Sequence, residues 1–429
     1  MKTTLILSGL IAFNATVFAD PQIASWYTLD SGKFAQIYRT DAEKASGRAE
    51  TTWSNGRQIQ SQPAYCGVQA ILSSSNWIYV RSTGLGSQVM GPWQNGWFPN
   101  LPVDQHFIFA FPRHPTVQTS QGANRMFEIG LFVDGVRMFD ATDALSYSHA
   151  NGRDADPRAG IGQGDRIWNR DALVNEGRTF DAAFAHQENR GTYHYHAEPI
   201  ALRYELGDHV DFDPATKTCR ESGGAPVKHS PILGWMHDGY PIYGPYGYSN
   251  PSDPASGVRR MVSGFVLRDG RDGADNLAQT GRRALPAWEA RENHRSAVLE
   301  SFETGPDVSG QYPIGHYIED YAYLGDLGKI AGRDFDLDEL NGRWCVTPEF
   351  PGGTYAYFTT IDAGGQPVYP YNMGRRYHGN PNGRLVRSIN EPVMTNFLAH
   401  PVVVKPTAPS SAKTEALIWN PGTGAYETK

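Results

Sequence analysis

Cysteine is scarce in this 429-residue chain, which contains only Cys66, Cys219 and Cys345. No two of them have the CxxC spacing of a thiolate metal cluster or a thioredoxin-like redox site, so the sequence argues against both. Two of the three thiols could pair in an oxidising compartment, and three unpaired thiols are the alternative. A chain of this length does not depend on a disulfide for its core.

Charge is also low: charged residues make up 19% of the chain, the formal net charge is -7, and no run of Lys or Arg occurs. Because nucleic-acid binding requires a clustered basic surface, we expect no nucleic-acid partner. Several short enzyme signatures are missing, namely a GxSxG elbow, a GxxxxGK phosphate loop, an HExxH helix and a dinucleotide fingerprint. Any catalytic chemistry must therefore lie in other patterns.

Long hydrophobic runs are confined to the start of the chain. Lys2 precedes an apolar stretch over residues 5–13, and residues 17–19 end in the small Ala19. These are the three parts of a secretory signal, and we expect residues 1–19 to be a signal peptide cleaved after Ala19. A membrane anchor is the alternative, but polar residues such as Asn14 interrupt the ~20 apolar residues that a span requires. We expect a secreted or periplasmic protein with no membrane span in the mature chain.

Glycine and proline, by contrast, are plentiful, with 46 and 29 residues, and aromatic residues make up 12% of the chain. This composition predicts many turns around an aromatic-rich core. Runs such as 35–38 and 77–81 combine β-branched and aromatic residues and predict strands. Asp134-Gly135 between two apolar segments predicts a hairpin within residues 125–139. A further strand pair is expected over 353–361 and 367–371.

Helical patterns are sparse. The best example is 285–299, where a partly apolar stripe follows an early proline. The polar, aperiodic segment 146–169 predicts a long surface loop. The fold class is therefore mainly β, a large β-sandwich or jelly-roll-like domain with long loops and few helices. We expect one domain over residues 20–400, with a candidate sub-boundary near 120, and a linker with a short tail over 401–429.

Alternation of histidine and tyrosine at Tyr193-His194-Tyr195-His196 is the most unusual feature of the chain. In a strand, His194 and His196 would share one face with Cα atoms ~6.6 Å apart, from which both imidazoles can reach one metal ion. A hairpin would bring His186 beside them as a third ligand. Histidine favours a transition metal, copper or zinc in our prediction, over calcium. The alternative is a solvated strand face, or histidines hydrogen-bonded to carboxylates.

A second candidate site surrounds an apolar strand at 231–236. His229 precedes this strand and Asp238 follows it in a tight Asp238-Gly239 turn, which places both residues at a sheet edge. We predict catalytic roles for them, with His229 as a general acid or base or a further ligand. As alternatives, Asp238 closes its turn by accepting backbone hydrogen bonds, and His229 is structural.

Carboxylates at alternate positions, Asp334, Asp336 and Asp338, suggest a calcium loop. The helix-loop-helix calcium pattern fails, because Glu339 stands where it requires glycine and Cys345 where it requires glutamate. An irregular calcium loop and a solvated acidic turn are the two remaining interpretations.

Two longer segments, GTYHYHAEPIALRYELGDHVDF at 191–212 and KHSPILGWMHDGYPIYGPYGY at 228–248, resemble the YHYH-domain family of exported proteins. With shorter matching strings the resemblance spans residues 26–379. The naming motif falls on His194 and His196, so the resemblance implies that they are functional, but it implies no settled activity. One departure is Gln88, where we expect a histidine in relatives.

These patterns together predict an exported metal-binding protein, a metal-dependent hydrolase or oxidase acting on a small molecule or polymer. The alternative is a non-catalytic protein that binds glycans or cell-envelope polymers. An exposed row of tyrosines around Tyr243, Tyr246 and Tyr248 would favour that alternative.

Overall fold

The computed structural model describes residues 20–93, 100–119, 128–293 and 295–400, together with the backbone of 417–420 and 425–428. The expected signal peptide and linker lie outside the described residues, and the candidate sub-boundary near 120 falls where a gap in them begins. The single domain over 20–400 therefore stays a prediction.

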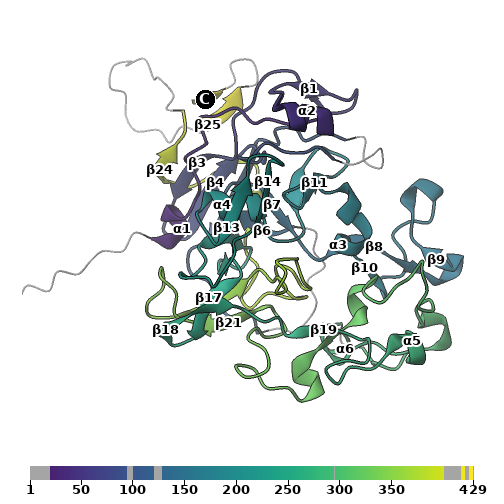
Figure 1. Cartoon of the computed structure of the whole chain (residues 1–429). Coiled ribbons are helices and arrows are strands. Elements are labelled where there is room, and N and C mark those ends of the chain that lie inside the picture. The colour runs from purple at the N-terminus through teal and green to yellow at the C-terminus, as the bar shows by residue number, and fades with distance from the viewer. Residues whose placement is uncertain are drawn as a thin grey trace, which may run out of the picture.

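Two large sheets form the main body (Figure 1). The five-stranded sheet has the order β23-β5-β4-β3-β24, with β23 at Arg384–Val386, β5 at Phe107–Pro112, β4 at Trp77–Ser82, β3 at Val68–Ser73 and β24 at Met394–Leu398. The eight-stranded sheet has the order β11-β12-β7-β6-β15-β16-β22-β21, with β11 at Ala185–Gln187, β12 at Tyr193–Tyr195, β7 at Arg137–Phe139, β6 at Glu128–Phe132, β15 at Ile232–Met236, β16 at Pro241–Tyr243, β22 at Thr354–Phe358 and β21 at Gly342–Cys345. Most neighbouring strands are antiparallel, but β12 pairs in parallel with β7, and β16 with β22.

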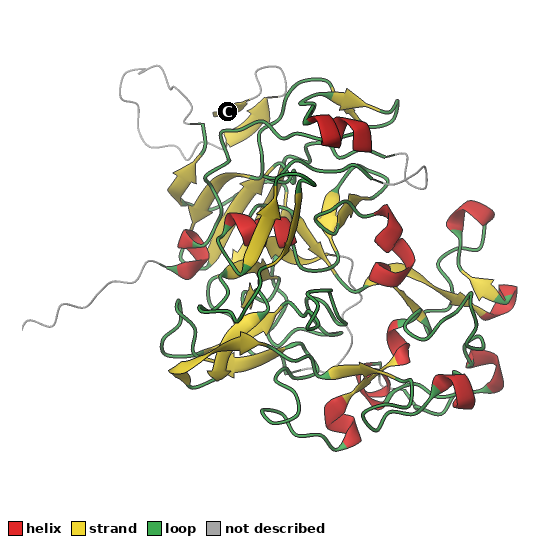
Figure 2. Ribbon diagram, viewed as in Figure 1, coloured by secondary structure: helices red, strands yellow, loops and turns green. Residues whose placement is uncertain are grey.

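One hydrophobic core joins the two sheets. Val80 and Phe109 of the five-stranded sheet and Leu131 and Trp235 of the eight-stranded sheet are fully or almost fully buried in it. Burial of apolar faces against each other is what holds a β-sandwich together. The predicted fold class, mainly β and sandwich-like with few helices, is confirmed (Figure 2).

A second part of the molecule, built from residues 141–176 and 263–340, packs beside the sandwich and is called the side lobe below (Figure 1). It contains the three-stranded sheet β10-β8-β9 and the pair β19-β20, with β10 at Asn169–Asp171, β8 at Thr142–Ser148, β9 at Arg153–Asp154, β19 at Phe265–Leu267 and β20 at Tyr321–Tyr323. Its own core centres on Trp168 and Trp288, which are buried.

The remaining elements are short. The two-stranded sheets are β1 at Trp53–Ser54 with β2 at Ile59–Gln60, β13 at Val210–Asp213 with β14 at Thr218–Glu221, β17 at Tyr246–Asn250 with β18 at Asp253–Arg260, and β25 at Leu417–Asn420 with β26 at Ala425–Thr428. The α-helices are α1 at Pro21–Ala24, α2 at Asp41–Ser46, α3 at Ala172–Glu176, α4 at Ile200–Glu205, α5 at Leu277–Thr280 and α6 at Ala287–Glu292. The 3-10 turns are η1 at His149–Asn151, η2 at Pro157–Ala159, η3 at Gly177–Thr179, η4 at Ser301–Glu303, η5 at Ile318–Asp320 and η6 at Leu324–Leu327.

Several local predictions are confirmed and others need correction. The Asp134-Gly135 hairpin joins β6 to β7 as expected. The predicted helix over 285–299 is only α6, because the chain then folds back so that the Leu285 amide donates to the Ala297 carbonyl. The predicted loop over 146–169 carries β9 and two 3-10 turns, since its backbone pairs with β8.

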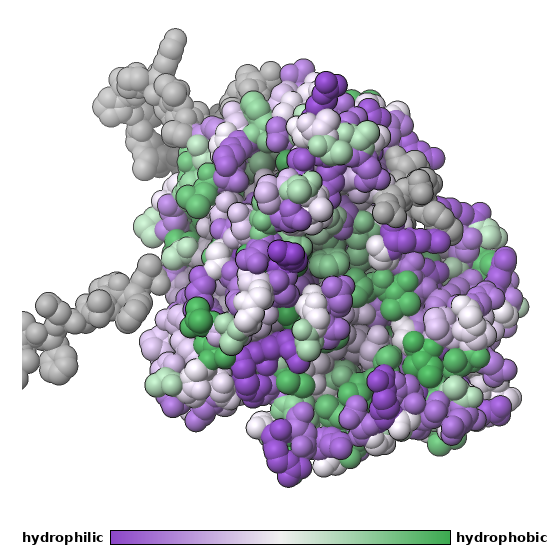
Figure 3. Space-filling view, in the orientation of Figure 1, coloured by the Kyte–Doolittle hydropathy of each residue, from purple (hydrophilic) through white to green (hydrophobic). Residues whose placement is uncertain are grey.

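The three cysteines are free, with Cys66 and Cys345 buried and Cys219 half-buried. Among the helices of the described residues, none combines the length and apolarity needed to cross a bilayer. Polar residues cover much of the face seen in Figure 3.

Candidate metal centre

Polar residues from several strands lie close together at one edge of the eight-stranded sheet. His196 directly follows the end of β12, and Asp140 follows the end of β7, which runs parallel to it. Antiparallel pairing puts the start of β11, the start of β6 and the end of β15 at the same edge. Residues from five strands therefore meet at one place in the fold.

The predicted hairpin between β11 and β12 is present and places His186 directly opposite His194. Its turn depends on Gly191, which has φ of 77° and whose amide donates to the Glu188 carbonyl at 2.9 Å. A Cβ at this position would lie 2.8 Å from the Leu101 carbonyl oxygen. Only glycine tolerates both conditions, so this residue fixes the register of the hairpin.

His186, His194 and His196 form a buried triad, with one ring nitrogen from each lying within 4.8 Å of the others. Their exposed fractions are 3%, 2% and 3%. Nε2 of His194 lies 3.2 Å from Nε2 of His196. The prediction of three converging histidines is confirmed, and the solvated strand face is excluded.

Each Nδ1 atom of the triad is occupied by a hydrogen bond that points away from the centre. Nδ1 of His194 lies 2.9 Å from the Thr192 carbonyl, and Nδ1 of His196 lies 2.7 Å from the Asp140 carbonyl. A carbonyl can only accept, so both histidines carry their proton on Nδ1 when neutral. The Nε2 lone pairs of these two residues then face each other.

Thr179 sets the same tautomer on His186. Its hydroxyl donates to the Glu176 carbonyl at 2.7 Å, so its oxygen accepts from Nδ1 of His186, also at 2.7 Å. All three imidazoles thus present an unprotonated Nε2 to one point, the orientation that partners beyond the ligands give to metal-bound histidines.

This geometry suits a tetrahedral ion. Two nitrogens ~2.0 to 2.1 Å from an ion and 3.2 Å apart subtend about 100° at it, close to the tetrahedral angle. Without a cation or a proton between them, lone pairs at this distance repel. Three histidine nitrogens would hold such an ion with the same number of protein ligands as catalytic zinc sites use.

Aromatic rings enclose the triad and keep it neutral. Phe139 stacks on His194 with centroids 3.9 Å apart, and Phe180 is parallel to His196 at 5.9 Å. Burial lowers the pKa of His186 and His194 well below the usual value and that of His196 to about 4. The rings are therefore unprotonated at pH 7, the state that a metal ligand needs.

Glu176, at the end of α3, is the functional candidate that sequence reasoning missed. Its Oε2 lies 3.6 Å from Nε2 of both His186 and His196, and 17% of its side chain is exposed. Burial, and then the charge of Asp143, raise the pKa of this carboxyl well above its usual value. No local sequence pattern connects it to the histidines, because α3 belongs to the side lobe.

A family model described as YHYH protein matches residues 108–368, which is more than half of the chain. The chain belongs to the YHYH family. The matched span includes the triad and Glu176. No curated protein and no solved structure matches the chain.

The tyrosines of the YHYH motif lie on the opposite face of β12 from the histidines. Nε2 of Gln88 donates to the hydroxyls of Tyr193 and Tyr195 at 3.1 and 2.9 Å. Gln88, the departure from the expected family pattern, therefore contacts the tyrosine face of the motif and not the histidine triad.

The two predicted catalytic residues lie at opposite ends of β15 in the YHYH fold. Asp238 is fully buried and closes its turn by accepting from the Tyr240 amide at 3.1 Å. Its other oxygen accepts from the Tyr357 hydroxyl and the Gly379 amide at 2.7 and 2.8 Å. Burial raises its pKa to about 6. His229 precedes β15 and lines a surface pocket of about 580 Å³ with Tyr248. Neither residue belongs to the triad, and their catalytic roles stay predictions.

The three acidic residues proposed for calcium each engage a different partner. Asp336 forms two hydrogen bonds with Arg259 at 2.5 and 2.6 Å, Asp334 pairs with its neighbour Arg333, and Asp338 accepts from Tyr355. Among the described residues, the histidine triad is the group that could hold a metal. The structure does not bring these carboxylates together into a calcium loop.

Proposed function

We propose that this member of the YHYH family is an exported metal-dependent hydrolase that holds zinc or copper with His186, His194 and His196. The observation that carries the proposal is the convergence of three Nε2 atoms whose tautomers are fixed by Thr179, Thr192 and Asp140. A bound ion would supply a Lewis acid and a water of lowered pKa.

Glu176 supports hydrolysis rather than oxidation. Its carboxylate stands beside two of the ligand nitrogens at 3.6 Å, outside direct hydrogen-bonding distance, and is the more exposed member of the cluster. A carboxylate in this place can accept the proton of an attacking water and return it to a leaving group. The buried histidines position the ion and exclude bulk water.

The glycan-binding alternative lacks its expected surface. Tyr243 is fully buried, Tyr246 is 7% exposed, and Tyr248 is half-buried against His229. The Tyr243 hydroxyl instead bonds to Thr347 at 2.8 Å. These tyrosines pack within the fold and do not form a stacking platform.

Metal titration tests the centre directly. Protein collected from the exported fraction, which should begin at Asp20, is stripped of metal and titrated with Zn²⁺ and with Cu²⁺ by calorimetry. We expect one ion per chain, and loss of this binding in the double variant H194A/H196A. H229A is the matched control, a buried histidine outside the triad, and should keep full stoichiometry. No binding by the wild type, or unchanged binding by H194A/H196A, would overturn the proposal.

The role of Glu176 is tested with 4-nitrophenyl acetate as a generic ester. We expect E176Q to bind zinc with wild-type stoichiometry and to lose about 10²- to 10⁴-fold in kcat, the usual contribution of a general base. Loss of zinc from E176Q would instead make Glu176 a ligand. Equal hydrolysis by E176Q and wild type would exclude it as the base.

A further inference from the structure

A row of three polar side chains continues from the triad across neighbouring strands of the same sheet. Arg137 on β7 is aligned with His194 on β12, Glu128 begins β6, and His237 follows the end of β15. Nε of Arg137 lies 3.1 Å from Oε2 of Glu128, whose Oε1 lies 3.7 Å from Nε2 of His237. With strands ~4.8 Å apart, the row extends about 14 Å from the metal centre.

Buried aromatic rings hold these polar groups in place. The Arg137 guanidinium lies 4.8 Å from the Phe107 centroid, and His237 lies between Phe109 at 5.0 Å and Tyr377 at 5.9 Å. Packing of this kind fixes side-chain rotamers before a ligand arrives.

The row is partly accessible and retains hydrogen-bonding capacity. The exposed fractions of the Arg137, Glu128 and His237 side chains are 16%, 15% and 15%. Nε2 of His237 has no hydrogen-bond partner among the described residues. Burial lowers the pKa of His237 to about 3, so this ring is neutral. Partly exposed polar groups with free hydrogen-bonding capacity, lying beside a candidate metal centre, are candidates for substrate binding.

Charge in the row favours a neutral substrate. The positive Arg137 is paired with Glu128, whose pKa burial raises to about 7, and His237 carries no charge, so the row offers little net charge to an ionic group. It offers guanidinium donors alongside carboxylate and imidazole acceptors. A molecule with several hydroxyl groups, each both donor and acceptor, matches this mixture.

We propose that Arg137, Glu128 and His237 form the substrate-binding row of the metal centre and that the substrate is a neutral carbohydrate carrying a hydrolysable acyl group. The proposal rests on the hydrolase function above. Water attacks the acyl carbon, the bond from that carbon to the sugar oxygen breaks, the acid is released, and the proton returns to the sugar hydroxyl.

The test compares two esters with the zinc-loaded full mature chain. Acetylated xylobiose is the carbohydrate ester, and 4-nitrophenyl acetate has no sugar. We expect E128Q and R137M to lower kcat/KM for acetylated xylobiose at least tenfold, mainly through KM, and to lower kcat/KM for 4-nitrophenyl acetate less than they do for the sugar ester. R291M is the matched control, since Arg291 pairs with Asp326 in the side lobe.

Binding provides a readout that needs no metal. Unacetylated xylobiose should bind to the metal-free wild type in a calorimetric titration and bind at least tenfold more weakly to E128Q, an isosteric change that keeps the fold. Three results would overturn the proposal that the row binds a carbohydrate. They are no binding of xylobiose to wild type, equal binding of xylobiose to E128Q and wild type, and faster hydrolysis of an acetylated tripeptide than of the sugar ester. Failure of zinc-loaded wild type to hydrolyse either ester while xylobiose still binds would overturn the hydrolase function and leave the row as a carbohydrate site.

Discussion

At the scale of single residues, the partners of the imidazoles decide what the triad can do. Three histidines on a strand edge could equally be protonated, or could use Nε2 as a donor. The Thr192 and Asp140 carbonyls keep the proton of the neutral rings on Nδ1, and Thr179 does the same for His186. Burial, which lowers the pKa of all three histidines, keeps the rings unprotonated. The ability to bind a metal thus depends on residues that never touch the ion.

Thr179 offers the cleanest test of this dependence. T179V removes the acceptor that holds the Nδ1 proton of His186, so we expect zinc affinity to fall about 10- to 100-fold, the usual effect of losing a partner of a histidine ligand. T179S keeps the hydroxyl and should keep the affinity. The dissociation constants are measured by competition with a chelator. An unchanged constant in T179V would show that His186 is oriented by other contacts.

The same residues show what the sequence could predict. Alternation in Tyr193-His194-Tyr195-His196 predicted which side chains share a face, because a strand has a period of two. His186 followed from a turn that the sequence makes visible. Glu176 could not be predicted, since the chain from 177 to 184 returns through Phe184 at φ of 65°, held by the Asp181 carboxylate that accepts from the Ala183 amide. Nothing in the composition of that segment indicates such a path.

At the scale of elements, the site depends on the order of strands in the eight-stranded sheet. The parallel pairing of β12 with β7 puts Asp140 beside His196, and the β6-β7 hairpin puts Glu128 beside Phe139. The hairpin was predictable from Asp134-Gly135, because that dipeptide favours a tight turn. The parallel pair was not, since a pairing between distant segments leaves no local pattern.

The buried Asp134 carboxyl in the turn of this hairpin makes the free energy of unfolding depend on pH. Asp134 is buried, and burial raises its pKa to about 7 from an ordinary 3.8. The folded state therefore keeps a proton that the unfolded state has lost, and the free energy of unfolding falls as pH rises from about 4 to about 7 and is then constant.

D134N removes this titration while Asn-Gly still suits the turn. Between pH 5 and pH 8 we expect the variant to gain about 3 kcal/mol of stability relative to wild type, the equivalent of two pKa units. Urea unfolding at both pH values measures the difference. A stability difference between the two proteins that is the same at pH 5 and pH 8 would contradict the raised pKa.

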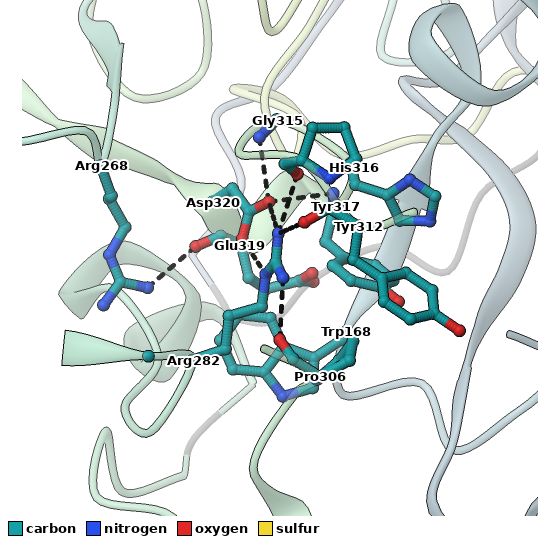
Figure 4. A network of polar contacts seen from close by, with 12 residues as sticks. Trp168, Arg268, Arg282, Pro306, Tyr312, Gly315, His316, Tyr317, Glu319 and Asp320 are labelled. Atoms are coloured by element: carbon teal, nitrogen blue, oxygen red, sulfur yellow. Dashed lines mark hydrogen bonds and ion pairs between the residues drawn. The ribbon is translucent and has the colours of Figure 1, made fainter. Parts of the chain in front are cut away.

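At the scale of the whole molecule, the metal centre combines two separately built parts. The sandwich supplies the histidines, and the side lobe supplies Glu176 through α3. The lobe is organised by Arg282, which pairs with Asp320 at 2.7 Å in a site where both side chains are fully buried (Figure 4). Next to Asp320, Glu319 accepts from the Asn169 amide at 2.7 Å and so fixes β10, which leads directly into α3.

Arg282 therefore links the stability of the lobe to the position of the Glu176 carboxylate, the proposed general base. R282M leaves Asp320 buried without its partner, and we expect a loss of about 3 to 5 kcal/mol in the free energy of unfolding. R282M/D320M removes both charges and should recover most of that loss. Because the histidines belong to the other part, zinc stoichiometry should stay at one while hydrolysis of 4-nitrophenyl acetate decreases. Equal loss of stability in the single and double variants would show that the unpaired Asp320 charge is not the cause of the loss. Loss of zinc together with activity would show that zinc binding by the sandwich depends on the side lobe.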